Sequence, residues 1–294
     1  MTKHKFSGTG VALITPFKSN KEIDYQSLEK IINHVIDNGI DYIVTLGTTG
    51  ETPTLSPAEK QEVARFTVQT VAQRTPIVVG IGSNNTAETI NAIRNFDLQG
   101  IDGILSITPY YNKPNQEGIY QHYKAIGEAS PLPVIAYNVP GRTGVNMTAE
   151  TTLRIAADCP NIVAIKEASG NLTQIMQILQ NRPEHFLVLS GDDSLTYPMM
   201  ALGADGVISV AAQAVPKTFS DMVHFALDGE FAAARQNHYQ VLDLMEALFA
   251  DGSPAGVKTA LHLSGLCENE LRLPLVPVNE KVFKLIQHLV NVKH

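Results

Sequence analysis

Eight short apolar runs, separated by stretches with helical periodicity, constrain the fold of this chain more than any other feature. Each run is four or five residues long and does not alternate with polar residues. Continuous apolar runs of this length are typical of strands that are buried on both faces, as in a parallel sheet. The runs are 11–14, 42–46, 77–80, 103–106, 134–137, 162–166, 186–190 and 206–209.

The stretches between the runs carry helix signals. Residues 24–37 place apolar side chains at helical spacing, and residues 56–59 combine an N-cap serine, a proline and an early acid. Residues 86–96 and 148–157 are similar. Eight strand-helix alternations predict an α/β protein with a (β/α)8 TIM barrel. A doubly wound sheet is the alternative, but no Gly-x-Gly-x-x-Gly follows the first run, so a dinucleotide site is not supported.

The pattern changes after residue 229. Residues 230–249 and 279–292 indicate amphipathic helices, and Ser253-Pro254 begins another helix that ends near Gly265. Prolines forbid a helix over residues 271–277, so this segment is expected to be extended. The sequence therefore predicts a barrel domain over residues 1–229 and a small C-terminal helical domain over residues 230–294.

Composition excludes several classes of protein. Of the 294 residues 44% are hydrophobic, which is ordinary for a large core, and the net charge of -7 offers no basic surface for nucleic acid. No N-terminal apolar region follows the first basic residues, and no run approaches the length of a membrane helix. The two cysteines, Cys159 and Cys267, form no CxxC pair, and the histidines show no HxH or HExxH spacing. We expect a cytoplasmic protein without metal or other cofactor.

Lys166 ends the sixth run and is the first candidate for a reactive group. In TIM barrels the active site lies at the carboxyl ends of the strands. A buried ammonium costs free energy unless it is paired or neutral, and burial lowers the pKa of lysine. A neutral, positioned amine can form a Schiff base with a carbonyl. The alternative is a strand that ends at the surface with this side chain in water.

Polar groups also follow the second, fourth and fifth runs. The loop Gly47-Thr48-Thr49-Gly50-Glu51 can bring hydroxyls and backbone N–H groups to a small anion, or it can be a simple turn with Glu51 in water. Tyr110 and Tyr111 follow the fourth run, where packing is their usual role. Arg142 follows the fifth run and can bind a carboxylate with its planar guanidinium, or can be solvated.

The last two runs end differently. The seventh run leads into Gly191-Asp192-Asp193, whose two acids suggest a metal site but, without clustered partners, are expected to cap the next helix. The eighth run contains Ile208 and leads into small residues, which leave room for a ligand. Because so many of the runs end in groups able to react or bind, the surface interpretation of Lys166 becomes the less favoured one.

Three motifs together resemble a known family. They are residues 47–51, residues 137–144 (Tyr-Asn-Val-Pro-Gly-Arg-Thr-Gly) and residues 165–168 (Ile-Lys-Glu-Ala). The chain resembles, over essentially its whole length, the 4-hydroxy-tetrahydrodipicolinate synthase family of pyruvate-dependent class I aldolases. The first and third motifs are shared with relatives such as N-acetylneuraminate lyase, and the arginine-containing turn discriminates better.

The resemblance implies a reaction and an assembly. Members condense pyruvate with L-aspartate-4-semialdehyde to 4-hydroxy-tetrahydrodipicolinate, the first committed step of lysine and diaminopimelate biosynthesis. They need no cofactor and are usually homotetramers, built as dimers of tight dimers. By resemblance, Lys166 forms the Schiff base with pyruvate, and Tyr111 reaches across the tight dimer interface into the neighbouring site.

The remaining roles are implied in the same way. Tyr137 and Thr48 complete the proton relay with Tyr111. Thr49, the Ile208 backbone and Gly191 bind substrate, and Arg142 binds the carboxylate of the semialdehyde.

Two alternative functions stay open at this point. Another pyruvate aldolase, such as an N-acetylneuraminate or keto-deoxy-sugar lyase, is disfavoured by Arg142, because those substrates present hydroxyls where the semialdehyde presents a carboxylate. A binding protein on an inactive barrel is disfavoured because a pure binder has no need of an amine that can form an imine.

Feedback by lysine is a separate question. Members that lysine inhibits resemble this chain at Asn84, Glu88 and Tyr110, which form a cleft at the dimer interface. Where inhibited bacterial members often carry His or Glu, this chain has Pro57 and Lys60. A second cation near a cationic ligand predicts weak or absent inhibition by lysine. The alternative is that Lys60 points into water and changes nothing.

Overall fold

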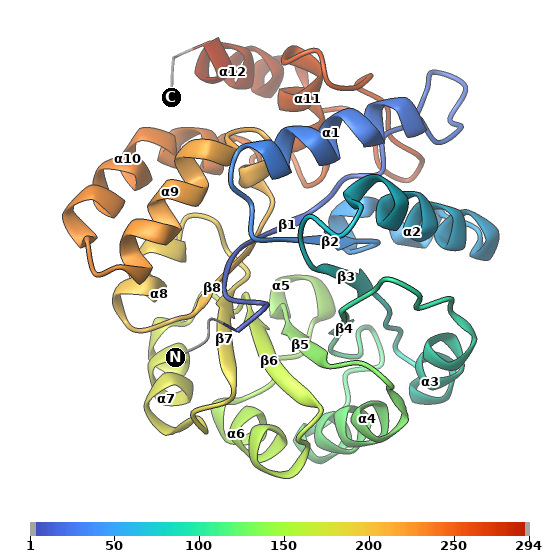
Figure 1. Ribbon diagram of the computed structural model, residues 1–294, viewed down its shortest axis with the longest axis vertical. Helices are drawn as coiled ribbons and strands as arrows, with labels where there is room; N and C mark the ends of the chain where they lie inside the picture. The colour runs from blue at the N-terminus through green and yellow to red at the C-terminus, as the bar shows by residue number, and fades with distance from the viewer. Residues whose placement is uncertain (1–3, 292–294) are drawn as a thin grey trace.

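Eight parallel strands close into a barrel in a computed structural model that describes residues 4–291 (Figure 1). The strands follow one another around the barrel in chain order, and β1 pairs with β8 to close it. They are β1 Gly8–Ala12, β2 Tyr42–Thr45, β3 Ile77–Gly80, β4 Gly103–Ile107, β5 Val134–Asn138, β6 Ile162–Glu167, β7 Leu187–Ser190 and β8 Gly206–Ser209. The predicted TIM barrel is confirmed, and the doubly wound sheet is wrong.

At least one helix follows every strand, and three more follow the barrel (Figure 1). The barrel helices are α1 Tyr25–Asp37, α2 Pro57–Val71, α3 Thr86–Asn95, α4 Gln116–Ala129, α5 Pro140–Thr143, α6 Ala149–Asp158, α7 Leu172–Asn181, α8 Thr196–Ala201 and α9 Pro216–Leu227. Side chains at the expected caps fix the starts of several helices. Asp24 accepts the N–H of Ser27, and Ser56 and Glu59 form a reciprocal capping box at the start of α2.

The C-terminal helices are α10 Phe231–Ala247, α11 Ala255–Leu263 and α12 Glu280–Asn291. They match the three predicted helices within two residues at each end, apart from Val292, which lies outside the described residues. Helix α10 packs against α9, so these helices continue the outer layer of the barrel. The division into domains 1–229 and 230–294 remains a prediction.

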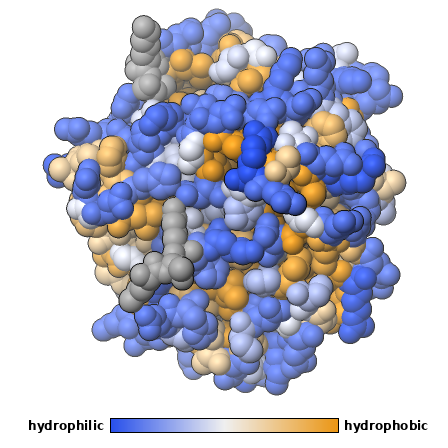
Figure 2. Space-filling view, viewed as in Figure 1, coloured by the Kyte–Doolittle hydropathy of each residue, from blue (hydrophilic) through white to orange (hydrophobic). Residues whose placement is uncertain are grey.

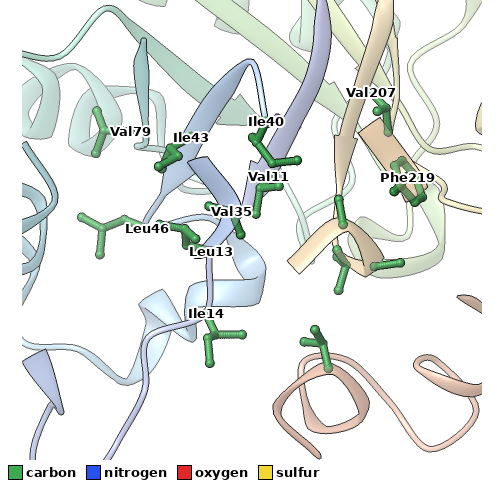
Figure 3. Close-up of a cluster of buried hydrophobic side chains, with 14 of the residues drawn as sticks. Val11, Leu13, Ile14, Val35, Ile40, Ile43, Leu46, Val79, Val207 and Phe219 are labelled. Atoms are coloured by element: carbon green, nitrogen blue, oxygen red, sulfur yellow. The ribbon is translucent and has the colours of Figure 1, made fainter. Parts of the chain in front are cut away.

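Side chains alternate between two cores along each strand. Ala12, Val44 and Val78 point into the barrel, whereas their neighbours Val11 and Ile43 belong to the layer between sheet and helices. Figure 3 shows part of that outer layer, where residues from β1 and β2 meet α1. The same alternation decides which residues of the later strands face the interior.

Two local predictions were wrong. The first run was predicted over residues 11–14, but β1 ends at Ala12, because the Ile14 N–H donates to the side chain of Gln213 at 2.9 Å instead of to a neighbouring strand. The segment 271–277 is not extended throughout. The Leu275 N–H donates to the Arg272 carbonyl at 3.1 Å, which closes a turn.

The surface of the protein is mostly hydrophilic on the face shown in Figure 2. Figure 2 shows hydrophilic residues over much of one face, with hydrophobic patches between them. Within residues 4–291 no helix combines the length and apolarity that crossing a bilayer requires.

Candidate active site

A cavity of about 430 Å³ opens at the carboxyl ends of the strands, where the sequence predicts the reactive groups. Its wall is made by strand ends, by the loops after them, and by residues at the end of α10 and between α10 and α11. The lining residues that matter below are Gly47, Thr48, Thr49, Tyr137, Arg142, Lys166, Gly191, Asp192, Asp193, Val210, Glu246, Phe249 and Ser253. The fold thus brings together residues that are up to 241 positions apart in the sequence, from Ala12 to Ser253.

Strand register places Lys166 inside the barrel. Ala164 belongs to the inner core and Ile165 to the outer layer, so Lys166 points inward again, beside Tyr137 of β5, with which it is paired in the sheet. Only 5% of the residue is exposed, so the surface interpretation is wrong. Within residues 4–291 no carboxylate lies within ion-pair distance of its Nζ, which sits 4.4 Å from the centre of the Tyr137 ring.

Burial tunes the two neighbouring groups. It lowers the pKa of Lys166 to about 8, with the charge of Asp193 opposing this shift and that of Arg142 adding to it. Burial raises the pKa of Tyr137 to about 12, opposed by Arg142. The amine is therefore partly neutral near neutral pH, and the phenol keeps its proton.

The two acids after β7 differ in role. Asp192 accepts the N–H groups of Ser194 and Leu195 and so caps the turn that leads into α8. Asp193 does not cap this helix with its side chain, which corrects the prediction. Its buried carboxylate instead accepts the N–H of Val210 at 3.2 Å and that of Ala211 at 2.8 Å, which ties β7 to the loop after β8. Residues 4–291 contain no cluster of three or more His, Cys, Asp or Glu side chains suited to a metal ion.

Gly191 leaves space for the reactive lysine. A Cβ atom at this position would lie 2.7 Å from the Cβ of Ala168 and 3.1 Å from both Cε and Cγ of Lys166. Since real Cβ atoms do not approach backbone-fixed neighbours this closely, a glycine here keeps open the room in which the lysine side chain lies.

The threonine loop forms the opposite wall. Residues Thr48–Gly50 make a short 3₁₀ turn, with Thr49 buried and Thr48 exposed at the lip of the cavity. Both line the cavity together with Tyr137, although within residues 4–291 the hydroxyls of Thr48 and Tyr137 do not bond to each other. Arg142 lies in α5 and is exposed at the mouth.

Two predicted site residues lie apart from the cavity wall. The Ile208 side chain is buried in the inner core of the barrel, and Val210, two residues further along, lines the cavity instead. Tyr111 is 88% exposed and does not line the cavity. Its backbone has a φ of 71°, a conformation that a tyrosine rarely adopts.

A second cavity of about 430 Å³ adjoins the first. The two share Thr48, Tyr137 and Arg142, and the second is also lined by Lys60 and Tyr110. Lys60 is half-buried, and its effect on a ligand remains a prediction.

The other two candidate regulatory residues lie outside this wall. The Asn84 carbonyl accepts a hydrogen bond from the Asn112 side chain at 2.9 Å. Glu88 is exposed and accepts the Ser83 hydroxyl at 3.4 Å. Of the four residues Asn84, Glu88, Tyr110 and Lys60, only Tyr110 and Lys60 therefore line the second cavity within the described part of one chain.

Sequence reasoning missed an ion pair behind the threonine loop. The alternative in which Glu51 lies in water is wrong, because Glu51 and Lys258 are both buried and form an ion pair. It also missed that Glu246, Phe249 and Ser253 contribute to the cavity wall. The available signal was the run 255–261, in which Lys258 is the only charged residue among small and apolar ones.

Comparison with known proteins agrees with this geometry. The model of the dihydrodipicolinate synthetase family matches residues 5–293. A 4-hydroxy-tetrahydrodipicolinate synthase of Phocaeicola vulgatus is 52% identical over 99% of this chain and 98% of its own length.

Solved structures give the same result. A dihydrodipicolinate synthase of Cyanidioschyzon merolae with lysine bound is 42% identical, with a TM-score of 0.94 and 98% of each chain covered. The chloride-inhibited enzyme of Acinetobacter baumannii complexed with pyruvate is 40% identical, with a TM-score of 0.94 and 97% of each chain covered. The chain therefore belongs to the dihydrodipicolinate synthetase family, the 4-hydroxy-tetrahydrodipicolinate synthases, which are lyases of lysine biosynthesis.

Proposed function

We propose that this chain condenses pyruvate with L-aspartate-4-semialdehyde to 4-hydroxy-tetrahydrodipicolinate through a Schiff base on Lys166. The observation that carries the proposal is the buried Lys166 amine, which lines the cavity and has a pKa lowered to about 8. At pH 7 such an amine is neutral in roughly a tenth of the molecules, which is enough to attack a ketone. The pyruvate complex of the A. baumannii relative supports this choice of first substrate.

The covalent steps balance without an added reagent. The Lys166 nitrogen attacks the pyruvate keto carbon, and water leaves to give an iminium ion. The iminium withdraws electrons, so the methyl group loses a proton and becomes an enamine. The enamine carbon attacks the aldehyde carbon of the second substrate, and the aldehyde oxygen takes up a proton. Attack of that substrate's own amine on the iminium carbon then closes the ring and releases Lys166.

Tyr137 and Thr48 are proposed to move these protons. With a pKa of about 12, the Tyr137 phenol stays protonated at neutral pH, so it donates a hydrogen bond and gives up its proton only as it takes another from a chain of hydroxyls. Thr48 lines the same cavity and can extend that chain on one side. We infer that Tyr111 of a second copy supplies the other side, because the chain's own Tyr111 is exposed and away from the cavity.

The remaining assignments concern binding. Thr49, the Ile208 backbone and Gly191 are proposed to hold pyruvate, and Arg142, at the mouth, the carboxylate of the semialdehyde. We further propose a homotetramer built from two such dimers and a cytoplasmic location. The two buried, unbonded cysteines, Cys159 and Cys267, agree with a reducing compartment.

Reductive trapping tests the proposal. Cyanoborohydride with pyruvate should add one reduced pyruvyl group, which peptide mass mapping should place on Lys166 alone. Because only the neutral amine attacks, the initial rate of adduct formation should follow the pKa of Lys166, about 8. It should rise between about pH 7 and about pH 9 and then level off. A Lys166→Ala protein should form no adduct, whereas Lys60→Met, in the wall of the adjoining second cavity, should still be labelled at Lys166.

Adduct formation by the Lys166→Ala protein would overturn the proposed mechanism. Turnover with L-aspartate-4-semialdehyde against N-acetylmannosamine as the aldehyde then distinguishes the synthase from a sugar-acid lyase.

A further inference from the structure

The ion pair between Glu51 and Lys258 joins two segments 207 residues apart, and neither side chain is exposed. Both charged groups also have further partners. The Lys258 ammonium donates to the Glu270 carbonyl at 2.8 Å, and the second oxygen of Glu51 accepts the Arg272 N–H at 3.0 Å. The Glu51 carboxylate is thus held by Lys258 of α11 and by the Arg272 backbone in the segment after α11.

Glu51 ends the loop that lines the cavity. It directly follows the turn Thr48–Gly50, and its φ of 52° is left-handed, as is the φ of 56° at Leu46 before the loop. Neither residue is a glycine, so this backbone costs free energy and must be held by its surroundings. The Glu51 side chain extends from one of these two strained positions, so its partners help to fix the turn, together with Thr52, whose hydroxyl donates to the Leu46 and Gly47 carbonyls at 2.7 and 2.9 Å.

The opposite end of the ion pair is fixed to the same cavity. Phe249 and Ser253 line the cavity just before α11 begins. A Cβ at Gly256 would lie 2.1 Å from the Leu248 carbonyl oxygen, so α11 packs directly against the backbone at the end of α10. Lys258, one turn into α11, therefore has a fixed position relative to the cavity wall.

We propose that Glu51 and Lys258 are positioning residues, which set the distance of Thr48 and Thr49 from Lys166 and so determine how well pyruvate is held. This inference rests on the proposed function, since it assigns pyruvate to the Thr49 side of the cavity. A buried ion pair adds little stability compared with a well-packed apolar pair, so geometry explains its presence better than stability does. A shift of about 1 Å at such a wall is enough to lower activity by roughly 10²-fold.

The first test shortens the carboxylate arm. Glu51→Asp keeps the charge and removes one methylene, so the turn must move or the ion pair must lengthen. We expect the KM for pyruvate to rise about tenfold, with a smaller change in kcat and little change in Tm. Glu280→Asp is the matched control, because Glu280 pairs with Lys284 on the surface of α12 and should leave KM unchanged.

A double-mutant cycle separates positioning from general structural support. If Glu51 acts through Thr49, then Glu51→Asp combined with Thr49→Val should raise the KM for pyruvate no further than the more severe single variant does. A purely structural role predicts that the two effects multiply. If Glu51→Asp does not fold, Glu51→Gln combined with Lys258→Met removes both charges, and the same cycle is run on that background.

The outcomes are distinguishable. No pyruvate adduct on Lys166 of the unmodified protein would overturn the proposed function and this inference with it. A normal adduct, with an unchanged KM for pyruvate or multiplying effects in the cycle, would overturn the positioning role alone.

Discussion

At the scale of single residues, burial shifts the pKa values of two neighbouring groups, the Lys166 amine and the Tyr137 phenol, in opposite directions. Burial disfavours the charged form of Lys166 and of Tyr137 alike, and so lowers the pKa of the first to about 8 and raises that of the second to about 12. The result is an amine able to attack and a phenol able to donate, 4.4 Å from Nζ to the ring centre. Within residues 4–291 no carboxylate pairs directly with Lys166, and the charge of Asp193 only partly opposes the effect of burial.

The two roles proposed for Tyr137 and Arg142 should separate in kinetics. Tyr137→Phe removes only the hydroxyl and should lower kcat by about 10²–10⁴-fold, the usual loss for acid–base catalysis. Arg142→Ala, at the exposed mouth, should mainly raise the KM for the semialdehyde and leave pyruvate trapping intact. Steady-state kinetics and trapping on both variants check this. Equal loss of trapping in the two would contradict the assignment.

Single residues also show what the sequence can reveal. Lys166 could be predicted because it ends an apolar run at a known functional edge of the fold. Lys258 carries a weaker signal, as the single charge in the run 255–261, but its pairing with Glu51 could not be predicted, because Glu51 follows a glycine-flanked turn that looks solvated. An ion pair across 207 positions depends on how α11 meets the barrel, which no local pattern encodes.

At the scale of elements, the residue after β7 determines how much space the Lys166 side chain of β6 has. The missing side chain of Gly191 leaves space for Lys166, and Gly191→Ala would bring a methyl group to 3.1 Å from its Cε. We expect the fold to survive and the rate of adduct formation to fall at least about tenfold. Trapping kinetics measure this. Gly141→Ala is the matched control, because nothing lies within 4 Å of its Cβ position, and it should trap within about twofold of the parent.

Helix α2 carries the prediction on feedback. Lys60 and Tyr110 line the second cavity, so a lysine ligand there would meet a like charge, at a cost on the order of 1 kcal/mol or more. We expect weak or absent inhibition by lysine, and a lower half-inhibitory concentration after Lys60→His. Lys124→His, on the exposed face of α4, is the control. Half-inhibition of the parent at sub-millimolar lysine would contradict the expectation.

Element boundaries were predictable where local chemistry sets them. Capping side chains such as Asp24 and Ser56 mark helix starts in the sequence itself. The end of β1 was not predictable, because Leu13 and Ile14 are as apolar as the strand, and the side chain of the distant Gln213 takes the Ile14 N–H. Tertiary partners override the local pattern there.

At the scale of the whole molecule, one chain leaves a proposed catalytic residue unused. Tyr111 is 88% exposed and held in a left-handed conformation, which suits a side chain that points away from its own barrel. A shared site predicts complementation. Tyr111→Phe chains mixed with Lys166→Ala chains, each with little activity, should recover part of it, since one of the two sites in a mixed dimer then has both residues.

Subunit exchange must be demonstrated by native mass spectrometry on isotopically labelled chains. Mixed dimers proven in this way, but without recovered turnover, would contradict the shared site.

The late position of Lys258 and Arg272 has a consequence for the order in which the protein matures. A ribosome releases the barrel strands well before residues 258 and 272 of the 294 leave the exit tunnel. Until then the Glu51 carboxylate lacks both of its distant partners, and the cavity lacks the wall made by Phe249 and Ser253. The growing chain therefore holds Lys166 in an unfinished pocket, and we expect it to trap pyruvate only after residue 272 has emerged and folded.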